Sequence, residues 1–417
     1  MYLYLCMFHK IAIYNLQFFR YMEKDEESAK WAVAYTFQAV TRHNPDRMKA
    51  HAAQAMPIAF LAMHEPKSED NADILDVWDE VWTDGTPGTE SGIKLYMKEI
   101  VALLSSALES SQWKMKAQAS KAMGAIGVKL KSQIPVKEQG TLLVQLIEAL
   151  AGRTWTGKES ILIAIKDLIE ANPENVSNML VDANNPLTEE IVMKCLLREC
   201  GKERIEYKIV AIDTTSTILR CLDLDYFESL YTMLIPFIRK ALDDENSDKK
   251  VEEDEVETYS LDLQMAVVKS LGQAWPESPD TQHKFVEEFL SVLNAMIQNT
   301  TRKLQMAITT TLGLVISSYN TKADLDAIVF DKASNILAFG LSMPKNSQLR
   351  GEALNVLDQT LDVLSRSTTE KEEFYAKVNK SLDDVIKDLA TDAALKDKAR
   401  KMKARLTNMS EAPMDCD

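Results

Sequence analysis

Glycine and proline, the residues that most often interrupt regular backbone, are scarce in this sequence. Only 13 glycines and 12 prolines occur among 417 residues, and alternating runs of β-branched residues are hard to find. Strands and the tight turns between them depend on such features. Their scarcity excludes a mainly β fold, and the sequence predicts an all-α protein.

Cysteine is also rare, and the cysteines form neither a metal-binding pattern nor a disulfide pattern. The five are Cys6, Cys195, Cys200, Cys221 and Cys416. They contain no CxxC pair, and the five histidines contain no HExxH motif, so a zinc site is not predicted. We expect free thiols in a reducing compartment, and no metal or other cofactor.

Basic charge is in deficit. The 48 Lys and Arg residues face 63 Asp and Glu residues, which gives a net charge of −15 and a pI of about 5.0. Nucleic-acid binding requires clustered Lys and Arg, so we predict protein partners and no nucleic acid. No run is long and apolar enough to span a bilayer, so direct membrane insertion is not predicted. Residues 1–25 are left as an unassigned amino-terminal extension.

Catalytic motifs are missing as well. The segment Gly152–Glu159 has the GxxxxGK spacing of a phosphate-binding loop, but Glu159 stands where a hydroxyl should bind magnesium. A carboxylate there would repel phosphate, and the preceding segment is helical, whereas the motif requires a strand. The sequence contains no nucleophile elbow of the GxSxG type. It therefore predicts no catalytic residues, and we expect a protein that is not an enzyme.

What the sequence does contain is a recurring helical segment. The first residue of each copy, here called the anchor position, is Lys116, Lys158, Lys208, Gln264, Gln305 or Arg350, at intervals of between 41 and 56 residues. Seven residues after the anchors come Met123, Ile165, Thr215, Leu271, Leu312 and Leu357. Helix pairs that recur about every 40 residues are typical of HEAT and armadillo repeats. The sequence therefore predicts an α-solenoid of HEAT/armadillo-like helical repeats.

Partner helices are predicted between these segments, at 93–108, 138–150, 187–200, 226–242, 283–298, 323–341 and 372–389. A long helix is expected near 46–64, kinked or ended at Pro57, and a degenerate copy of the repeat near residue 73. The predicted organisation is a first half at 26–242, an acidic loop at 243–258, a second half at 259–405 and a polar tail at 406–417. The acidic loop is either only solvated or a docking site for a basic partner.

The basic anchors Lys116, Lys158, Lys208 and Arg350 would lie near one edge of the stack. They either contribute to a partner-binding edge, only solvate that edge, or reach a carboxylate in a neighbouring repeat. Tryptophans also fall beside the recurring helices, at Trp113, Trp155 and Trp275. These serve either in packing between repeats or as aromatic contacts for a partner.

Several runs of this sequence resemble the carboxy-terminal region of the proteasome adapter and scaffold family, whose members are long HEAT-repeat proteins. They are MPIAFLAMHE (Met56–Glu65), WDEVWTDGTPGTESGIKLYMKEI (Trp78–Ile100), SQWKMKAQASKAM (Ser111–Met123), LAGRTWTGKE (Leu150–Glu159) and LLRECGKERIEYKIVAI (Leu196–Ile212). The resemblance is best from residue 28 to 240, and it rests mainly on helix pattern from 259 to 405.

The resemblance implies a non-catalytic adapter that binds the 26S proteasome. Such an adapter bridges the core and regulatory particles, monitors their assembly, and links proteasomes to other cellular components. It implies a cytoplasmic and nuclear protein with peripheral association to the endoplasmic reticulum or endosomes. The alternative is a HEAT-repeat scaffold of another complex, of the transport-receptor or phosphatase-scaffold type, which shares the repeats but not these runs.

Overall fold

The computed structural model describes residues 27–67, 71–245, 261–319, 327–343, 346–365 and 372–411. All regular structure within these ranges is helical, which confirms the all-α prediction. The chain divides into two compact units, Met1–Leu222 and Asp223–Asp417. Among the helices of the described ranges, none is both long and apolar enough to cross a membrane.

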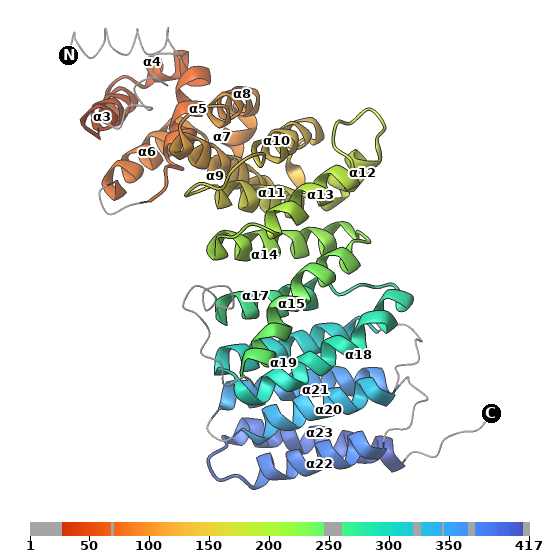
Figure 1. Cartoon of the computed structure of the whole chain (residues 1–417). Helices are drawn as coiled ribbons and strands as arrows, with labels where there is room; N and C mark the ends of the chain where they lie inside the picture. The colour runs from red at the N-terminus through yellow and green to blue at the C-terminus, as the bar shows by residue number, and fades with distance from the viewer. Residues whose placement is uncertain are drawn as a thin grey trace. The chain divides into compact units, whose positions relative to one another are not determined.

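The first unit consists of helices that form successive pairs from α8 onward (Figure 1). Its helices are α3 (Glu27–His43), α4 (Pro45–Ala50), α5 (Ala52–Ala62), α6 (Ala72–Gly85), α7 (Thr89–Leu95), α8 (Met97–Leu108), α9 (Trp113–Leu130), α10 (Val136–Ala149), α11 (Glu159–Ala171), α12 (Pro173–Val181), α13 (Glu189–Cys200) and α14 (Ile205–Leu222), with a 3-10 turn η1 (Lys131–Gln133). The pairs are α8 with α9, α10 with α11, and α13 with α14.

The second members of these pairs lie side by side and run in the same direction. A Cβ placed on Gly157, just before α11, would lie 3.3 Å from the Cβ of Ala117 near the start of α9. Further along, a Cβ on Gly127 of α9 would lie 2.8 Å from the carbonyl oxygen of Asp167 in α11. Contacts therefore advance along both helices together, as parallel packing requires. Because the helix backbones nearly touch at Gly127, only glycine fits there.

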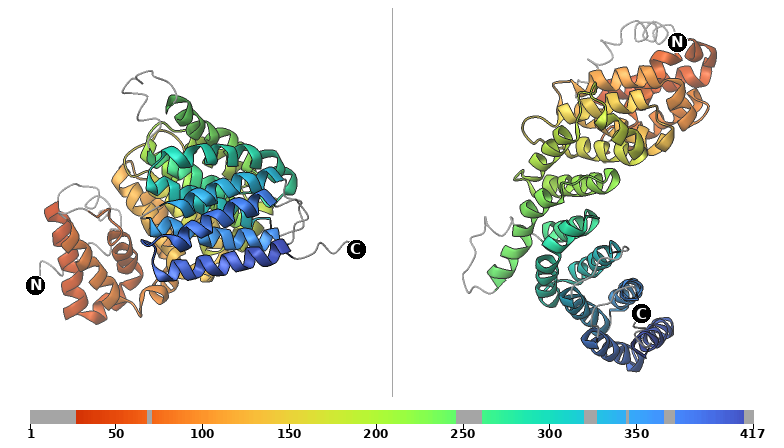
Figure 2. Two further views of the ribbon diagram at one scale, coloured as in Figure 1. Left: turned by 90° about the horizontal axis from the view of Figure 1, so that it is seen from below. Right: turned by 90° about the vertical axis from the view of Figure 1, so that its right-hand side faces the viewer.

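The second unit repeats this arrangement in two layers, which can be followed in Figures 1 and 2. Its helices are α15 (Phe227–Glu245), α17 (Leu261–Gln273), α18 (Pro279–Met296), α19 (Arg302–Ser317), α20 (Ala327–Ser342), α21 (Ser347–Leu364), α22 (Glu372–Lys387) and α23 (Ala393–Glu411), with a 3-10 turn η3 (Ile297–Asn299). Helices α17, α19, α21 and α23 pack in sequence as one layer, and α18, α20 and α22 form the other. Each repeat thus contacts mainly its neighbours, as in a solenoid.

The predicted core positions of the repeat are buried in both units. All six residues seven places after an anchor have 0% exposure, namely Met123, Ile165, Thr215, Leu271, Leu312 and Leu357. The one polar member, Thr215, satisfies its hydroxyl by donating to the carbonyl of Ala211 at 2.7 Å. The α-solenoid prediction is therefore confirmed at the level of individual side chains.

The boundary between the units lies before α15, whereas the sequence placed the division at the acidic segment 243–258. Aromatic packing explains the difference. Phe227 of α15 contacts Trp275, which follows α17, and both Phe227 and Tyr231 contact Phe285 of α18, with ring centroids 4.6–5.7 Å apart. These contacts tie α15 to the second unit. The acidic run begins within α15, which ends at Glu245, and residues 246–258 lie outside the described residues.

Local details differ from the sequence predictions in three places. The helix expected over 46–64 breaks at His51, and α5 continues through Pro57, because nine of the 11 residues of α5 are buried and hold it in place. Helix α12 was missed, although Asn172 caps it immediately before a proline, as Asn44 does before α4. Helix α23 extends to Glu411, past the predicted tail boundary at 405. Residues 1–25 lie outside the described residues.

Candidate functional site

The basic anchors were the residues predicted for a partner-binding edge, and the structure buries three of them. Lys158, Lys208 and Arg350 are 0%, 7% and 5% exposed, whereas Lys116 is half-buried. A partner cannot reach the three buried side chains, so the accessible-edge hypothesis is corrected for them. It stays a prediction for Lys116.

Lys158 points inward and connects two repeats. Its Nζ donates to the carbonyl of Leu150 at 2.8 Å and to Glu199 Oε2 at 3.2 Å. The same carboxylate accepts hydrogen bonds from the hydroxyl of Tyr207 at 2.8 Å and from Nε of Arg198 at 2.9 Å. The side chains of Lys158 and Glu199 are both 0% exposed. One carboxylate therefore holds the starts of α11 and α14 to the end of α13.

Burial and charge act in opposite directions on this cluster. Burial lowers the pKa of Lys158, while the adjacent Glu199 carboxylate opposes that shift. Burial raises the pKa of Tyr207, and its hydrogen bond to Glu199 adds to the increase, so the phenol stays a donor. The cluster is thus a satisfied polar network within the core.

The arrangement also settles the near match to a phosphate-binding loop. Lys158, which would contact phosphate, is enclosed and bound to Glu199. Glu159 accepts a hydrogen bond from the main-chain N–H of Gly157 at 3.1 Å, and Gly152 and Gly157 adopt positive φ values of 87° and 105°. The glycines make the turn between α10 and α11, and Lys158 is turned into the core, where a phosphate group cannot reach it.

Arg350 likewise connects two repeats in the second unit. Its Nε donates to the carbonyl of Leu341 at 3.0 Å, and Nη1 donates to Asp388 Oδ2 at 2.6 Å and to Thr391 Oγ1 at 2.5 Å. The hydrogen bond from Arg350 lowers the pKa of Asp388 to about 2. The third reading made from the sequence, a contact to a carboxylate in a neighbouring repeat, is therefore confirmed for Lys158 and Arg350.

The anchor position has a shared structural role that the sequence did not reveal. Lys158, Gln305 and Arg350 all donate to carbonyls where the preceding helix ends. For Gln305 the acceptors are the carbonyls of Ile297 and Thr300, at 3.3 and 3.2 Å. Carbonyls at a helix C-terminus lack partners within the helix, so a long donor side chain at the next helix start satisfies them. The signal in the sequence was the restriction of anchors to Lys, Arg and Gln.

The other candidate chemical groups give no site. In the parts of the chain that the structure describes, no three His, Cys, Asp or Glu residues are placed to hold a metal ion. Cys195, Cys200 and Cys221 are free thiols, and burial raises the pKa of Cys200 to about 12. Cys6 and Cys416 lie outside the described residues.

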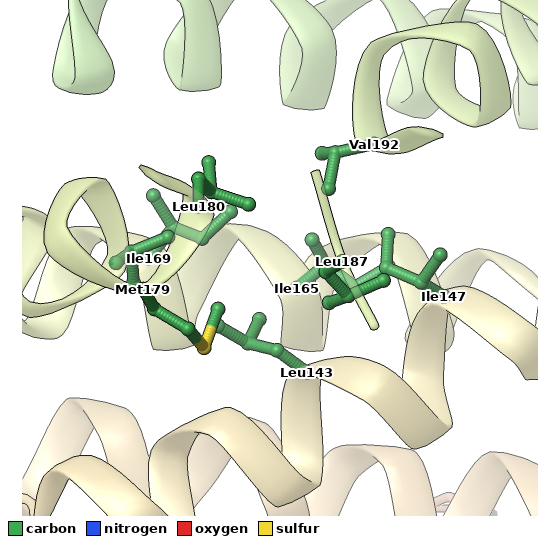
Figure 3. Close-up of a pocket in the computed structure, with 9 residues that line it drawn as sticks. Leu143, Ile147, Ile165, Ile169, Met179, Leu180, Leu187 and Val192 are labelled. Carbon is green, nitrogen blue, oxygen red and sulfur yellow. The ribbon is translucent and has the colours of Figure 1, made fainter. Parts of the chain in front are cut away.

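Two cavities among the described residues bring no reactive groups together. The first, shown in Figure 3, is an apolar void of about 10 Å³ between α10, α11, α12 and α13, which is room for about one water molecule. It is lined by Leu143, Ile147, Ile165, Ile169, Val176, Met179, Leu180, Leu187 and Val192. The second is an open groove between α19 and α21, lined by Leu314 and by polar residues that include Glu352 and Asp358. Asp358 is already bound to Arg405 at 2.5 Å.

The three tryptophans beside the recurring helices differ in exposure. Trp275 is buried, at 7% exposure, and it stacks on Phe289. Trp155 is half-buried, and Trp113, at the start of α9, is 46% exposed. Packing between helices accounts for Trp275, whereas Trp113 presents a large aromatic surface to solvent.

Known proteins related to this chain belong to one family. A family model described as "ECM29, C-terminal ARM-like repeats" matches residues 176–339. The human proteasome adapter and scaffold protein ECM29 is 34% identical over 360 residues, covering 83% of this chain and 19% of the human protein. The Drosophila melanogaster proteasome-associated protein ECM29 homolog is 28% identical over 324 residues, covering 75% of this chain and 16% of the fly protein. The chain thus spans less than a fifth of either relative.

Among solved structures, that of Kap95p with RanGDP is similar, with a TM-score of 0.54 and 14% identity. The similarity covers 98% of this chain and 54% of that protein. At this identity it establishes the solenoid fold alone. The family match and the two curated relatives confirm the resemblance read from the sequence: the chain is related to the carboxy-terminal ARM-like repeats of the ECM29 proteasome adapter and scaffold family.

Proposed function

We propose that this chain is a non-catalytic adapter that binds the 26S proteasome. In this role it stabilises or monitors the assembly of the core and regulatory particles, and it links them to other cellular components. The observation that carries the proposal is the 34% identity, over 360 residues, with the human protein named as a proteasome adapter and scaffold. Because the chain spans 19% of that relative, the proposal concerns what this repeat region contributes to binding.

The architecture supports a binding role. A stack of helix pairs exposes an extended surface while each repeat is held by its neighbours. In this chain the polar groups at the repeat junctions are engaged internally, as Lys158 with Glu199 and Arg350 with Asp388 show. Polar side chains committed in this way maintain the stack and are not available for chemistry. We therefore propose binding without catalysis.

The proposed partners are subunits of the regulatory and core particles, with no nucleic acid and no direct insertion into membranes. The net charge of −15 supports this choice, since phosphate backbones repel an acidic protein. We propose a cytoplasmic and nuclear location, with peripheral association to the endoplasmic reticulum or endosomes.

The alternative is a HEAT-repeat scaffold of the transport-receptor or phosphatase type. Its support is the fold similarity to Kap95p at 14% identity, which any HEAT-type solenoid would share. The runs that resemble the proteasome adapter and scaffold family, such as Leu150–Glu159, favour the proteasome as the binding partner. Capture that depends on the nucleotide state of Ran would instead support the alternative.

Affinity capture followed by crosslinking tests the proposal. The tagged full chain is incubated with cell extract under conditions that preserve the holoenzyme, and core and regulatory subunits are quantified by mass spectrometry. We expect subunits of both particles to be enriched over a tag-only control, with crosslinks to lysines of this chain. Absence of proteasome subunits from the captured material would contradict the proposal.

A further inference from the structure

We infer that the seam between α3 and α6 is a docking surface for a basic segment of a partner protein. This surface, here called the aromatic–acidic face, consists of an aromatic pair on α3 and exposed carboxylates on α6, namely Trp31, Tyr35, Asp73, Asp76, Asp79 and Asp84. The inference rests on the proposed function, because it names where a proteasome subunit would bind this repeat region and which charge that subunit would present.

Helices α3 and α6 pack side by side and run in the same direction (Figure 1). Lys30, near the start of α3, pairs with Glu65, which lies shortly before α6. Further along, Nε2 of Gln38 donates to Glu80 at 2.7 Å, and Nε of Arg42 donates to Glu80 at 2.6 Å. These two contacts join residues that are 42 and 38 positions apart in the sequence. Contacts therefore advance along both helices together, with a nearly constant offset.

The α3 side of the seam presents aromatic rings to solvent. The rings of Trp31 and Tyr35 are stacked, with centroids 5.3 Å apart, and Tyr35 is 51% exposed. The pair lies seven residues before Gln38 and Arg42, which contact α6, so all four side chains share one stripe of the helix. The aromatic pair therefore lies along the seam itself and is fixed there by the helix before any partner binds.

The α6 side of the seam presents carboxylates. Asp73, Asp76, Asp79 and Asp84 are exposed, and Glu80 is half-buried. Steps of three and four residues connect these positions, so they occupy one face of the helix, and the buried residues of α6 occupy the opposite face. By the offset between the two helices, the first two carboxylates lie beside the aromatic pair of α3.

The negative charge of this face is not matched by cations. Among the described residues, Arg42 is the one cation that pairs with a carboxylate of α6. Residues 71–92 contain six carboxylates and no Lys, Arg or His, and Lys94, the next cation along the chain, donates to Gln133. When residues 28–67 are added to this stretch, eight carboxylates face five cations. The carboxylates are Asp46, Glu65, Asp73, Asp76, Asp79, Glu80, Asp84 and Glu90, and the cations are Lys30, Arg42, Arg47, Lys49 and Lys67.

The rings and the carboxylates select the same charge in a partner. A Lys or Arg side chain is attracted to the face of a Trp or Tyr ring, and its hydrogen bonds to a carboxylate are stronger than those of an uncharged donor. Because Asp73 and Asp76 lie beside the aromatic pair, one cation can contact a ring and a carboxylate together. An acidic segment or a nucleic acid would be repelled by the same carboxylates. The face therefore fits a Lys- or Arg-rich segment.

The aromatic component also favours a protein partner over free counterions. Trp and Tyr are enriched among the residues that dominate binding energy at protein interfaces. A small inorganic cation gains little from an exposed ring in water, whereas an arginine side chain can stack on it. The pairing of aromatic and acidic side chains along one seam therefore points to a peptide segment.

The first test uses a synthetic peptide and the full chain. The probe is a tetramethylrhodamine-labelled nonapeptide with Arg at every third position and Gly or Ser elsewhere, and Glu replaces Arg in the control peptide. Fluorescence anisotropy measures binding. We expect the Arg peptide alone to bind, with an affinity that falls as salt rises. The variant Asp73→Asn/Asp76→Asn should weaken this binding at least fivefold.

A matched control variant separates the local effect from the change in net charge. Asp280→Asn/Asp384→Asn removes two exposed carboxylates from the second unit, one in the first turn of α18 and one inside α22. Asp73 and Asp76 likewise lie in the first turn and in the interior of α6. The control variant should bind the Arg peptide as wild type does.

A second pair of variants tests the aromatic contact. Tyr35→Ala should weaken binding of the Arg peptide about threefold, because the attraction between a cation and the ring is lost. Tyr35→Phe keeps the ring and should bind as wild type does. Because Tyr35 is half in solvent, neither change removes a core side chain.

Three results of the peptide experiments would overturn the inference. The first is equal affinity of the Arg peptide for wild type and Asp73→Asn/Asp76→Asn. The second is binding of the Glu peptide as tight as that of the Arg peptide. The third is tighter binding of a single-stranded oligonucleotide, because the partner would then be a nucleic acid.

Capture of purified 26S proteasome separates this inference from the proposed function. If wild type and Asp280→Asn/Asp384→Asn capture proteasome but Asp73→Asn/Asp76→Asn captures at least fivefold less, the aromatic–acidic face is supported. If all three capture equally, the face is refuted as the proteasome-binding surface while the proposed function stands. If wild type captures none, the proposed function fails, and the assignment of this partner fails with it.

Discussion

Replacing Glu199 with glutamine removes the one carboxylate that three donors share, two of them (Lys158 and Tyr207) buried. Lys158, Arg198 and Tyr207 all donate to it at 2.8–3.2 Å. In Glu199→Gln, the carbonyl of Leu150 still accepts a hydrogen bond from Lys158 at 2.8 Å, but no carboxylate compensates the lysine charge. Breaking a buried ion pair in this way costs about 3–5 kcal/mol, and we expect a loss of unfolding free energy in that range.

The double variant Lys158→Met/Glu199→Gln distinguishes this reason from a simple loss of packing. Methionine fills most of the lysine volume without a charge, and Nη2 of Arg198 still donates to the carbonyl of Leu150 at 3.3 Å. Because no isolated charge remains, the double variant should be about 2 kcal/mol more stable than Glu199→Gln alone.

Urea unfolding followed by circular dichroism measures the stability of the single and double variants at pH 7. Hydrogen exchange then locates the effect, because each repeat contacts mainly its neighbours. Faster exchange should appear first in α11, α13 and α14. A cost below about 1 kcal/mol for Glu199→Gln, or a double variant as unstable as the two singles combined, would refute the role assigned to this pair.

Three further predictions concern packing and pH. Gly127→Ala should lower the free energy of unfolding by about 1–3 kcal/mol, because the added Cβ would lie 2.8 Å from the Asp167 carbonyl oxygen. Urea unfolding measures this loss, and an unchanged midpoint would contradict the close contact between the helices. Leu312 is 0% exposed, and Leu312→Ala should lower the free energy of unfolding by about 2–5 kcal/mol. Hydrogen exchange should become faster mainly in α17, α19 and α21. Uniformly faster exchange along the chain would contradict the repeat architecture. Because Arg350 lowers the pKa of Asp388 to about 2, the stabilisation from that carboxylate is complete above its unfolded pKa of about 3.9 and is lost as pH falls through about 2. The stability gap between wild type and Asp388→Asn should therefore narrow from pH 6 to about pH 3, and a constant gap would contradict this linkage.

Periodicity was enough to predict the fold. The recurrence of apolar residues seven places after each anchor identified core positions such as Ile165 and Leu357, because a helix buries the same face in every repeat. The same reasoning failed at local breaks. Pro57 was expected to kink or end its helix, yet the burial of α5 carries the helix through it, and no periodic signal marks the break at His51.

The repeat pattern in the sequence could not predict whether a basic side chain is buried or exposed. A lysine in the first turn of a helix can point to solvent or back towards the preceding helix, and the choice depends on which acceptors that helix end offers. Lys158 donates hydrogen bonds to the carbonyl of Leu150 and to the carboxylate of Glu199, and its side chain is buried. Lys116 is only half-buried.

Hydrogen exchange of the full chain, with and without purified 26S proteasome, tests the central claim most directly. If the chain is a repeat scaffold that binds the proteasome, amides on one continuous surface should slow. We expect the interior of the stack to stay unchanged. Exchange that is identical in the two samples across all peptides would contradict the claim.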